Sequence, residues 1–300
     1  MLLAQRILNG PPLLLDAAMG TELERRGVGS GLPLWSARAL LHAPAAVLAI
    51  HAENVAAGAE ILTANTFRTH RRSLQKEGLG QRSKELTREA VFLAREAAGG
   101  APRPVFVVGG LSPLEDCYRP DLAPPDADLD REHAVQAGSL RDAGVDGILV
   151  ETQNSVRELL AAVRAARATG LPVIACVATD GAGRLLSGEP IEEAGRGLAP
   201  LEPEAAGINC VPADLLLADL NRLAASLPGR PLAAYGNLGA PTDAPGSFSR
   251  ELSPAEYARI ASGWLAAGAR IVGGCCGTTA SHTAALRTLL DGQATNIASP

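Results

Sequence analysis

The chain has 300 residues, of which 47% are hydrophobic and 20% charged, and its formal net charge is −5 at pH 7. This length suits one large domain and leaves no need for several small ones. A chain with this net negative charge has no basic stripe that would bind a phosphate backbone, so nucleic acid is not an expected partner. No apolar run approaches the roughly 20 residues that are needed to cross a bilayer.

The N-terminal segment MLLAQRILNGPPLLLD lacks the form of a secretory signal, because Pro11 and Pro12 interrupt its apolar stretch and no small-residue cleavage site follows. The five cysteines are an odd and low number for a secreted disulfide framework. We therefore expect a cytoplasmic protein with no membrane partner, whose cysteines are reduced thiols or metal ligands.

Short aliphatic or β-branched runs recur along the chain, separated by stretches rich in Ala, Leu, Glu and Arg that are long enough for helices. This alternation is typical of repeated βα units. Eight strands are expected, at residues 13–15, 60–63, 105–108, 147–150, 173–177, 206–208, 232–234 and 270–272. A (β/α)8 barrel uses about 250 residues, so we predict a (β/α)8 TIM barrel that forms a single domain over residues 1–300.

Amphipathic patterns between these runs predict helices. Ser253 before Pro254 is a typical helix start, and the glycines 144, 170 and 268 follow expected helices as left-handed stops. The helix after the fifth strand has no clear pattern. The others are expected at 45–57, 83–98, 131–143, 155–168, 213–226, 254–267 and 279–290.

Two polar or Pro-rich segments, 115–130 and 242–250, are expected to be long loops after the third and seventh strands, over the mouth of the barrel. Gly27, Gly29 and Gly31 follow polar residues and no strand, so they do not make a dinucleotide-binding fingerprint. The chemistry is therefore sought at the ends of strands.

Three cysteines come directly after predicted strands. RIVGGCC ends in Cys275 and Cys276, and AAGINC ends in Cys210. Adjacent cysteines rarely form an unstrained disulfide, and barrel enzymes keep their chemistry at the carboxyl ends of the strands. Three thiolates around Zn²⁺ leave a fourth position open, as in catalytic sites. The alternative is that all five cysteines are small buried apolar side chains.

The remaining candidate ligands lie elsewhere. Cys117 falls in the polar loop EDCYRP and Cys176 inside the run PVIACVAT, so both are expected to be buried thiols without a metal. His282 lies six residues beyond Cys276 within the last predicted helix, and we expect it on the helix surface.

Polar side chains follow four other predicted strands, with Asp16 after LLL, Asn65 after ILTA, Glu151 after GILV and Asn237 after LAAYG. Clustering at one rim is typical of barrel enzymes. Asn65 and Asn237 could equally be helix caps or turn residues. The two carboxylates suit the ammonium group of an α-amino acid.

At this point the motifs LDAAMGTELERRG, TANTFRTH, GILVETQNS, GINCV, YGNLG and GGCCGTT, in this order, resemble the homocysteine S-methyltransferase family over nearly the whole chain. Its most specific part is GGCC with GINC upstream. The resemblance implies that Cys210, Cys275 and Cys276 hold a zinc ion that binds homocysteine, and that Asp16 and Glu151 lie around the amino group of the substrate.

Two motifs depart from the family pattern. Ala17 follows the first Asp where the family usually has Gly, so the approach of homocysteine or backbone there would be tighter. The seventh-strand motif reads YGNLG where the family often has Tyr-Pro-Asn-Ser/Ala-Gly, although Asn237 and Gly239 are retained. Both departures concern details of the site.

The resemblance implies a zinc-dependent transfer of a methyl group from a sulfonium, S-methylmethionine or S-adenosylmethionine, to the homocysteine thiolate, forming methionine. An ordinary thiol is mostly protonated at neutral pH, and a metal lowers its pKa, so no general base and no catalytic residue beyond the metal site is expected. The expected substrate contacts are Asp16, Ala17, Asn65, Glu151 and Asn237.

The expected partners are small molecules only, and no folate or cobalamin module is expected within 300 residues. Two alternatives stay open. One is a thiol methyltransferase of the same fold that uses betaine, selenium compounds such as selenocysteine, or methylcobalamin on a partner protein. The other is a zinc-binding or amino-acid-binding barrel without turnover, because a fold alone does not prove catalysis.

Overall fold

The computed structural model describes residues 2–29, 31–240, 242, 246–250 and 252–297, with side chains as far as residue 292. Its eight parallel strands form one sheet in the order β1-β8-β7-β6-β5-β4-β3-β2. They are β1 Leu13–Leu14, β2 Ile61–Ala64, β3 Phe106–Leu111, β4 Gly147–Gln153, β5 Val173–Val177, β6 Ala205–Pro212, β7 Leu232–Asn237 and β8 Ala269–Gly274.

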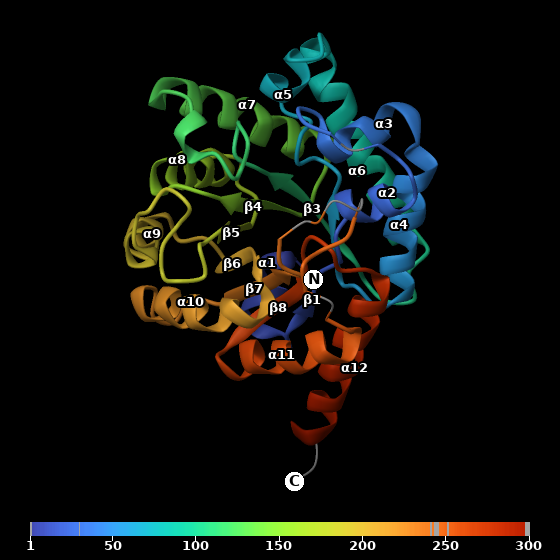
Figure 1. The fold of residues 1–300 in the computed structure, drawn as a ribbon, viewed down its shortest axis with the longest axis vertical. Coiled ribbons are helices and arrows are strands. Elements are labelled where there is room, and N and C mark those ends of the chain that lie inside the picture. The colour runs from blue at the N-terminus through green and yellow to red at the C-terminus, as the bar shows by residue number, and fades with distance from the viewer. Residues whose placement is uncertain (1, 30, 241, 243–245, 251, 298–300) are drawn as a thin grey trace.

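The sheet closes on itself between β1 and β2. Leu15 forms a parallel bridge with Ile61. The Asp16 N–H donates to the Ile61 carbonyl at 3.0 Å, and the Glu60 N–H donates to the Leu14 carbonyl at 2.8 Å. The predicted (β/α)8 TIM barrel of a single domain is therefore confirmed, with helices arranged around the strands (Figure 1).

All eight strands lie where they were expected, with shifted ends. The helices are α1 Leu3–Asn9, α2 Gly20–Arg25, α3 Arg38–His42, α4 Pro44–Ala56, α5 Arg71–Gln75, α6 Ser83–Gly99, α7 Asp126–Ala143, α8 Val156–Arg167, α9 Ile191–Leu198, α10 Ala213–Ser226, α11 Pro254–Ala266 and α12 Ala280–Ile297. The fifth outer helix, for which the sequence had no clear pattern, is α9.

One of the two predicted loops differs from the structure, and the other is only partly described. The segment 115–130 ends earlier than expected, because α7 begins at Asp126 with Asp126 and Asp128 in its first turn, where carboxylates interact favourably with the helix dipole. The segment 242–250 lies partly outside the described residues, and its described part holds no helix or strand.

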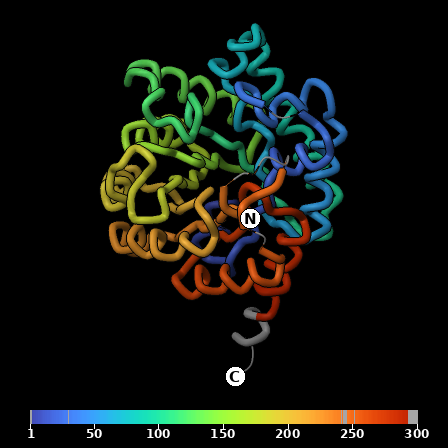
Figure 2. The backbone as a smooth tube through the Cα atoms, in the orientation of Figure 1, coloured from blue at the N-terminus to red at the C-terminus, as the bar shows by residue number. Residues whose placement is uncertain are grey.

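One end of the barrel is plugged by α1. Leu3 and Ile7 are 2% and 1% exposed and pack against the barrel-lining residues Leu13, Ile61 and Ile271. Gly147 makes room for this helix, since a Cβ there would lie 2.7 Å from Leu3 Cδ2. The tube in Figure 2 accordingly begins at the centre of the barrel.

The main core lies between the sheet and the outer helices and is almost entirely aliphatic. Its large aromatic side chains are Tyr257 and Trp264 of α11, whose rings meet edge to face with centroids 5.6 Å apart. The Tyr257 hydroxyl donates to the carbonyls of Gly236 and Gly273 at 2.8 and 2.9 Å. This tyrosine therefore ties α11 to the ends of β7 and β8.

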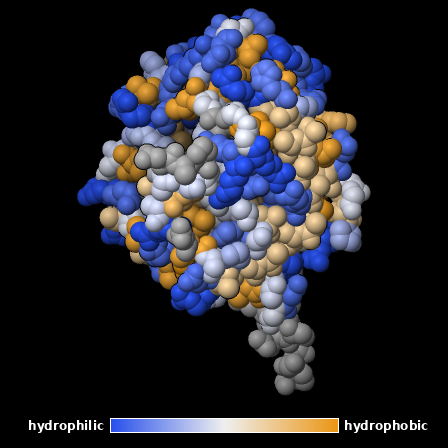
Figure 3. All heavy atoms as spheres, turned by 45° about the vertical axis from the view of Figure 1, so that its right-hand side comes forward, coloured by the Kyte–Doolittle hydropathy of each residue, from blue (hydrophilic) through white to orange (hydrophobic). Residues whose placement is uncertain are grey.

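Among the described residues, no single helix is both long and apolar enough to span a membrane. The pair Trp35–His42 and Pro44–Ala56 passes that test together, by length and composition only, with a bend of 114° between its two parts. The face that carries α3 and α4 shows pale orange, weakly hydrophobic areas between blue, hydrophilic ones (Figure 3).

Candidate metal and substrate site

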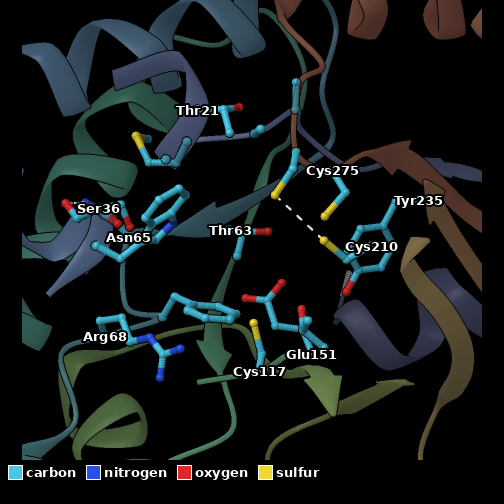
Figure 4. A pocket seen from close by; sticks show the side chains of 18 of the residues that line it. Thr21, Ser36, Thr63, Asn65, Arg68, Cys117, Glu151, Cys210, Tyr235 and Cys275 are labelled. Carbon is cyan, nitrogen blue, oxygen red and sulfur yellow. Dashed lines mark hydrogen bonds between the residues drawn. The ribbon is translucent and has the colours of Figure 1, made fainter. Parts of the chain in front are cut away.

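Three cysteines from two strand ends meet at one point. The Sγ atoms of Cys210, Cys275 and Cys276 all lie within 4.8 Å of one another, and those of Cys210 and Cys276 are 3.7 Å apart (Figure 4). Four ligands at about 2.3 Å around a tetrahedral zinc ion place neighbouring sulfurs roughly 3.8 Å apart. The thiols therefore fit a zinc ion in both chemistry and spacing.

Cys210 reaches this point through an irregularity in β6. The register with β7 shifts between Asn209 and Pro212, and Cys210 takes a left-handed φ of 54°. A non-glycine residue adopts this conformation at a cost of about 1–2 kcal/mol and persists in it where its surroundings hold it. Here Asn237 Nδ2 donates to the Cys210 carbonyl at 2.9 Å.

A matching irregularity lies at the end of β4. The register with β5 shifts between Val150 and Gln153, and Thr152 has a φ of 56°. The fully buried Asn209 side chain joins the two irregular strands, since its Oδ1 accepts from the Thr152 N–H at 2.9 Å and its Nδ2 donates to Thr152 Oγ1 at 2.8 Å. One side chain therefore supports both bulges.

Cys275 and Cys276 lie in the tight turn after β8. The Cys275 N–H donates to the Gly236 carbonyl at 2.9 Å, and the Cys276 carbonyl accepts from the Leu238 N–H at 3.1 Å, so β7 fixes the turn. Gly277 ends it with a φ of 88°, and a Cβ there would lie 2.7 Å from the Phe248 ring and 3.0 Å from Leu238. The last glycine of the GGCCG motif, Gly277, is therefore required for steric reasons.

The charge of the metal-free cluster is concentrated on one sulfur. Hydrogen bonding to the Cys275 and Cys276 thiols holds the pKa of Cys210 well below its usual value. The same contacts with Cys210 raise the pKa of Cys275 and of Cys276 well above theirs. A cation is therefore needed before the other two sulfurs ionise as well.

The cysteines border a cavity of about 270 Å³ at the carboxyl ends of the strands. Its rim includes Leu32 and Tyr118, which are 58% and 55% exposed. Aliphatic and aromatic side chains cover most of the remaining wall. The other polar side chains that line it are Asp16, Thr21, Ser36, Thr63, Asn65, Arg68, Asp116, Glu151 and Thr152.

Asp16 lies in this wall and is only 5% exposed. Its Oδ2 accepts from the Thr63 N–H at 2.9 Å, and burial raises its pKa to about 7. His51 Nδ1 lies 4.0 Å from the same oxygen, and burial lowers the pKa of His51 to about 4, so the imidazole is neutral. Neither ring nitrogen of His51 has a hydrogen-bond partner among the described residues.

Glu151 lies in the same wall (Figure 4). Burial raises its pKa to about 8, helped by the negative charges of Asp16 and Cys210. Gly110 leaves room for it, because a Cβ there would lie 2.4 Å from Glu151 Oε1. Two buried carboxyl groups that repel each other form a site that a cation would stabilise.

The other expected contact residues have different surroundings. Ala17 lines the cavity, and its N–H donates to Asn54 Oδ1 at 3.0 Å. Asn65 also lines it and donates to the Ser36 carbonyl at 2.9 Å. Asn237 does not belong to the cavity lining and instead contacts Cys210 and accepts from the Gly239 N–H at 2.9 Å. Asn237 therefore supports Cys210 from outside the cavity.

Cys176 is fully buried in β5, as expected. Cys117 is buried too, and burial raises its pKa to about 12, but it also lines the cavity. The expectation that His282 lies on the helix surface is wrong. It is 6% exposed, because its Nε2 bonds the Leu252 carbonyl at 3.2 Å while its Nδ1 accepts from the Thr279 N–H.

Tyr118 and Arg68 are among the residues of the site that were not anticipated from the sequence. The Tyr118 hydroxyl lies 3.3 Å from Cys210 Sγ, and Arg68 lies in the cavity wall. Tyr118 comes from the loop expected to cover the mouth of the barrel, and Arg68 follows Asn65 in the motif TANTFRTH. An aromatic residue in a long loop after a barrel strand was the available signal for Tyr118.

Comparison with known proteins places this geometry in context. The sequence model of the homocysteine S-methyltransferase family matches residues 13–290. The homocysteine S-methyltransferase of Escherichia coli (strain K12) is 32% identical, over 92% of this chain and 94% of its own length. The methionine synthase of Mycobacterium tuberculosis is 29% identical over 93% of this chain, but the match spans only 24% of that longer protein.

Solved structures give the same result. The crystal structure of the metallated form of the homocysteine methyltransferase MmuM from Escherichia coli superposes with a TM-score of 0.81 at 30% identity. The superposition covers 95% of this chain and 99% of that one. The two chains therefore share the same fold over nearly their whole length.

Proposed function

Because the chain belongs to the homocysteine S-methyltransferase family, we propose that this methyltransferase converts homocysteine to methionine with a zinc ion held by Cys210, Cys275 and Cys276. The observation that carries the proposal is the meeting of three thiols and two carboxyl groups at one cavity. On this proposal the barrel of residues 1–300 is one homocysteine-binding domain, and its partners are small molecules.

With three cysteines as ligands, the fourth coordination position of the metal would face the cavity and be open to the substrate. When bound, zinc would supply a Lewis acid that stabilises the thiolate form of homocysteine, whose thiol is otherwise protonated at neutral pH. The chain's own part is to hold the ligands in place, through the bulge at Cys210 and the turn at Gly277. No general base is required after the thiol proton is lost.

We assign the amino group of homocysteine to Asp16 and Glu151. A substrate ammonium between these two buried carboxyl groups favours their ionised forms and removes their mutual repulsion. Asp16 is already oriented by the Thr63 N–H, so one of its oxygens remains for the substrate. Ala17 and Asn65 form adjacent wall, while Asn237 acts through Cys210.

The methyl donor that suits this cavity is a sulfonium. Trp35, Phe67 and Tyr118 line it, and aromatic faces attract a cation that has lost its water. In the transfer a new bond forms between the homocysteine sulfur and the methyl carbon, the old bond between that carbon and the sulfonium sulfur breaks, and the donor leaves as a neutral thioether. The contribution of the cavity is to align the homocysteine sulfur with the methyl group of the donor.

Purified protein in a cobalamin-free buffer tests the proposal. We expect about one zinc per chain and methionine formation from homocysteine with S-methylmethionine or S-adenosylmethionine. Methionine formed only with betaine, or only with an added methylcobalamin protein, would overturn the donor assignment. Tight homocysteine binding without product from any donor would overturn catalysis itself and leave a binding barrel.

The metal ligands need their own control. Cys275→Ser and Cys276→Ser should lose zinc and activity while the far-ultraviolet circular dichroism of the barrel is unchanged. Cys176→Ser, a buried thiol of β5 outside the cluster, is the matched control and should retain zinc. Full zinc content in the Cys275 and Cys276 variants would contradict the ligand set.

A further inference from the structure

Arg68 is a buried cation in the wall of the cavity. It is 3% exposed and lies between β2 and α5, beside the ring of Phe67, with its Cζ 5.1 Å from the ring centroid. Arginine does not lose its charge in proteins, so its guanidinium remains a cation here despite the burial. Figure 4 shows Arg68 on the same side of the cavity as Cys117.

Its protein contacts are carbonyl oxygens. Nη1 donates to the carbonyls of Pro113 and Glu115 at 3.2 and 2.7 Å. The buried Nε has no acceptor, and Nη2 has no hydrogen bond to any described residue. No carboxylate of the described part of the chain forms an ion pair with Arg68 within 4.0 Å. Its direct contacts are the two carbonyl oxygens and the Phe67 ring.

The nearby carboxylates are engaged elsewhere. Glu115 pairs with Arg72 at 3.4 Å and also with Lys76. Glu158 contacts His133 at 3.2 Å and accepts from the Leu114 N–H at 2.8 Å. Asp116 accepts from the Tyr118 N–H at 2.9 Å. The guanidinium therefore lacks the bidentate partner that usually accompanies a buried arginine.

We propose that Arg68 binds the α-carboxylate of an amino-acid substrate in this cavity. Nε and Nη2 lie on one edge of the guanidinium, and that edge has the spacing of two carboxylate oxygens. A carboxylate that reaches Nη2 takes Nε as well after a small tilt of the group. The inference rests on the proposed function, and it adds an anion-binding subsite to a cavity whose other charged groups are acidic.

The position of Arg68 relates this subsite to the reacting sulfur. Cys117 and Asp116 line the cavity next to it, and Tyr118 places its hydroxyl 3.3 Å from Cys210 Sγ. An amino acid with its carboxylate on Arg68 therefore directs its side chain toward the cysteine cluster. Homocysteine and an amino-acid sulfonium both carry an α-carboxylate. The experiment therefore tests each of them separately.

The test compares each substrate with its α-carboxamide in the wild-type protein and in Arg68→Gln. The measurements are dissociation constants by calorimetry and KM in the methyl-transfer assay. We expect the wild-type protein to bind the carboxylate form of one substrate at least about tenfold more tightly than its amide, and Arg68→Gln to bind both forms of that substrate equally. The arm in which discrimination disappears identifies which substrate Arg68 holds.

Two controls keep the outcome decisive. Arg71→Gln, on the exposed start of α5, should discriminate like the wild-type protein. If Arg68→Gln does not fold, because the carbonyls of Pro113 and Glu115 lose their donor, the wild-type comparison alone decides. Equal binding of carboxylate and amide in both wild-type arms, or undiminished discrimination in a folded Arg68→Gln, overturns the proposal, and the zinc and methionine assays above stay independent of it.

Discussion

At the scale of single residues, Asp16 and Glu151 hold protons more tightly than ordinary carboxyl groups, with pKa values raised to about 7 and about 8 by burial. The native state thus binds these protons more strongly than the unfolded chain does. The resulting stability is fully present below the unfolded pKa values, near 4, and is lost as the pH rises through 7 and 8. Above that range the metal-free protein contains two mutually repelling buried anions.

Asp16→Asn should therefore stabilise the metal-free protein at alkaline pH. The gain over wild type grows between about pH 4 and pH 7 and levels off above that, at no more than about 4 kcal/mol. The asparagine oxygen can still accept from the Thr63 N–H. Thermal unfolding from pH 5 to pH 9 measures this gain in stability, with Asp142→Asn on the exposed part of α7 as control. An identical pH slope in Asp16→Asn and wild type would contradict the prediction.

Glu151→Gln should act on the substrate and spare the metal. Losing one charge opposite the substrate ammonium is expected to raise the KM for homocysteine by about 10- to 100-fold, since charge-assisted hydrogen bonds are worth about 1.5–3 kcal/mol. Zinc content, measured by mass spectrometry, should stay at the wild-type level. An unchanged KM for homocysteine rules out the assigned role.

At the scale of elements, the site depends on two interruptions of regular strand structure. Thr152 and Cys210 both adopt left-handed backbone at the ends of β4 and β6, and Asn209 bonds across the gap between them. Without the bulge, the Cys210 side chain would follow the regular alternation of its strand. The strained backbone is therefore what aims this thiol into the cavity.

Asn209→Ala should remove the side chain that holds these two strand ends in place. The loss of both hydrogen bonds is expected to lower the free energy of unfolding by about 1–3 kcal/mol and to speed the loss of zinc to a chelator. Chemical denaturation and a colorimetric chelator assay give the two quantities. Asn221→Ala, on the exposed side of α10, serves as the reference. Zinc loss at the wild-type rate would show that the bulge does not need Asn209.

The sequence predicted the barrel and the cysteine cluster for a shared physical reason. Parallel strands deliver their carboxyl ends to one rim, so Cys210 and the pair after β8 had to meet. The bulges were not predicted, because threonine and cysteine, the types found at Thr152 and Cys210, rarely adopt left-handed backbone. No range was predicted for the helix α9, since Gly195 and Gly197 lower its helix propensity. Arg68 was missed because a loop position depends on tertiary contacts.

At the scale of the whole molecule, stability and chemistry lie at opposite ends of the barrel. Leu3 and Ile7 of α1 close the amino ends of the strands, while the cavity opens at their carboxyl ends. The cluster around α1 contains the barrel-lining side chains and is separate from the larger core beneath the outer helices. Changes at the plug should therefore affect folding and leave the site intact.

Ile7→Ala is expected to lower the free energy of unfolding by about 2–5 kcal/mol through loss of buried surface and formation of a cavity. The zinc content and the KM for homocysteine of the folded protein should match those of wild type. Urea denaturation compares it with Leu8→Ala on the same helix, where the side chain is 53% exposed. Equal stability of the two variants would mean that α1 does not seal the barrel.

Cys210 lies far from Cys275 and Cys276 along the chain, so the thiols of the cluster are synthesised at different times. Cys210 and Cys276 are 66 residues apart, so at about 5–20 residues per second a ribosome makes them several seconds apart. Until then the emerging chain offers a single cluster thiol, because the turn that carries the other two follows β8 in the sequence. On the proposed function, binding of zinc by all three thiols consequently follows the synthesis of β8, so a zinc-loaded chain is one whose last strand has been made.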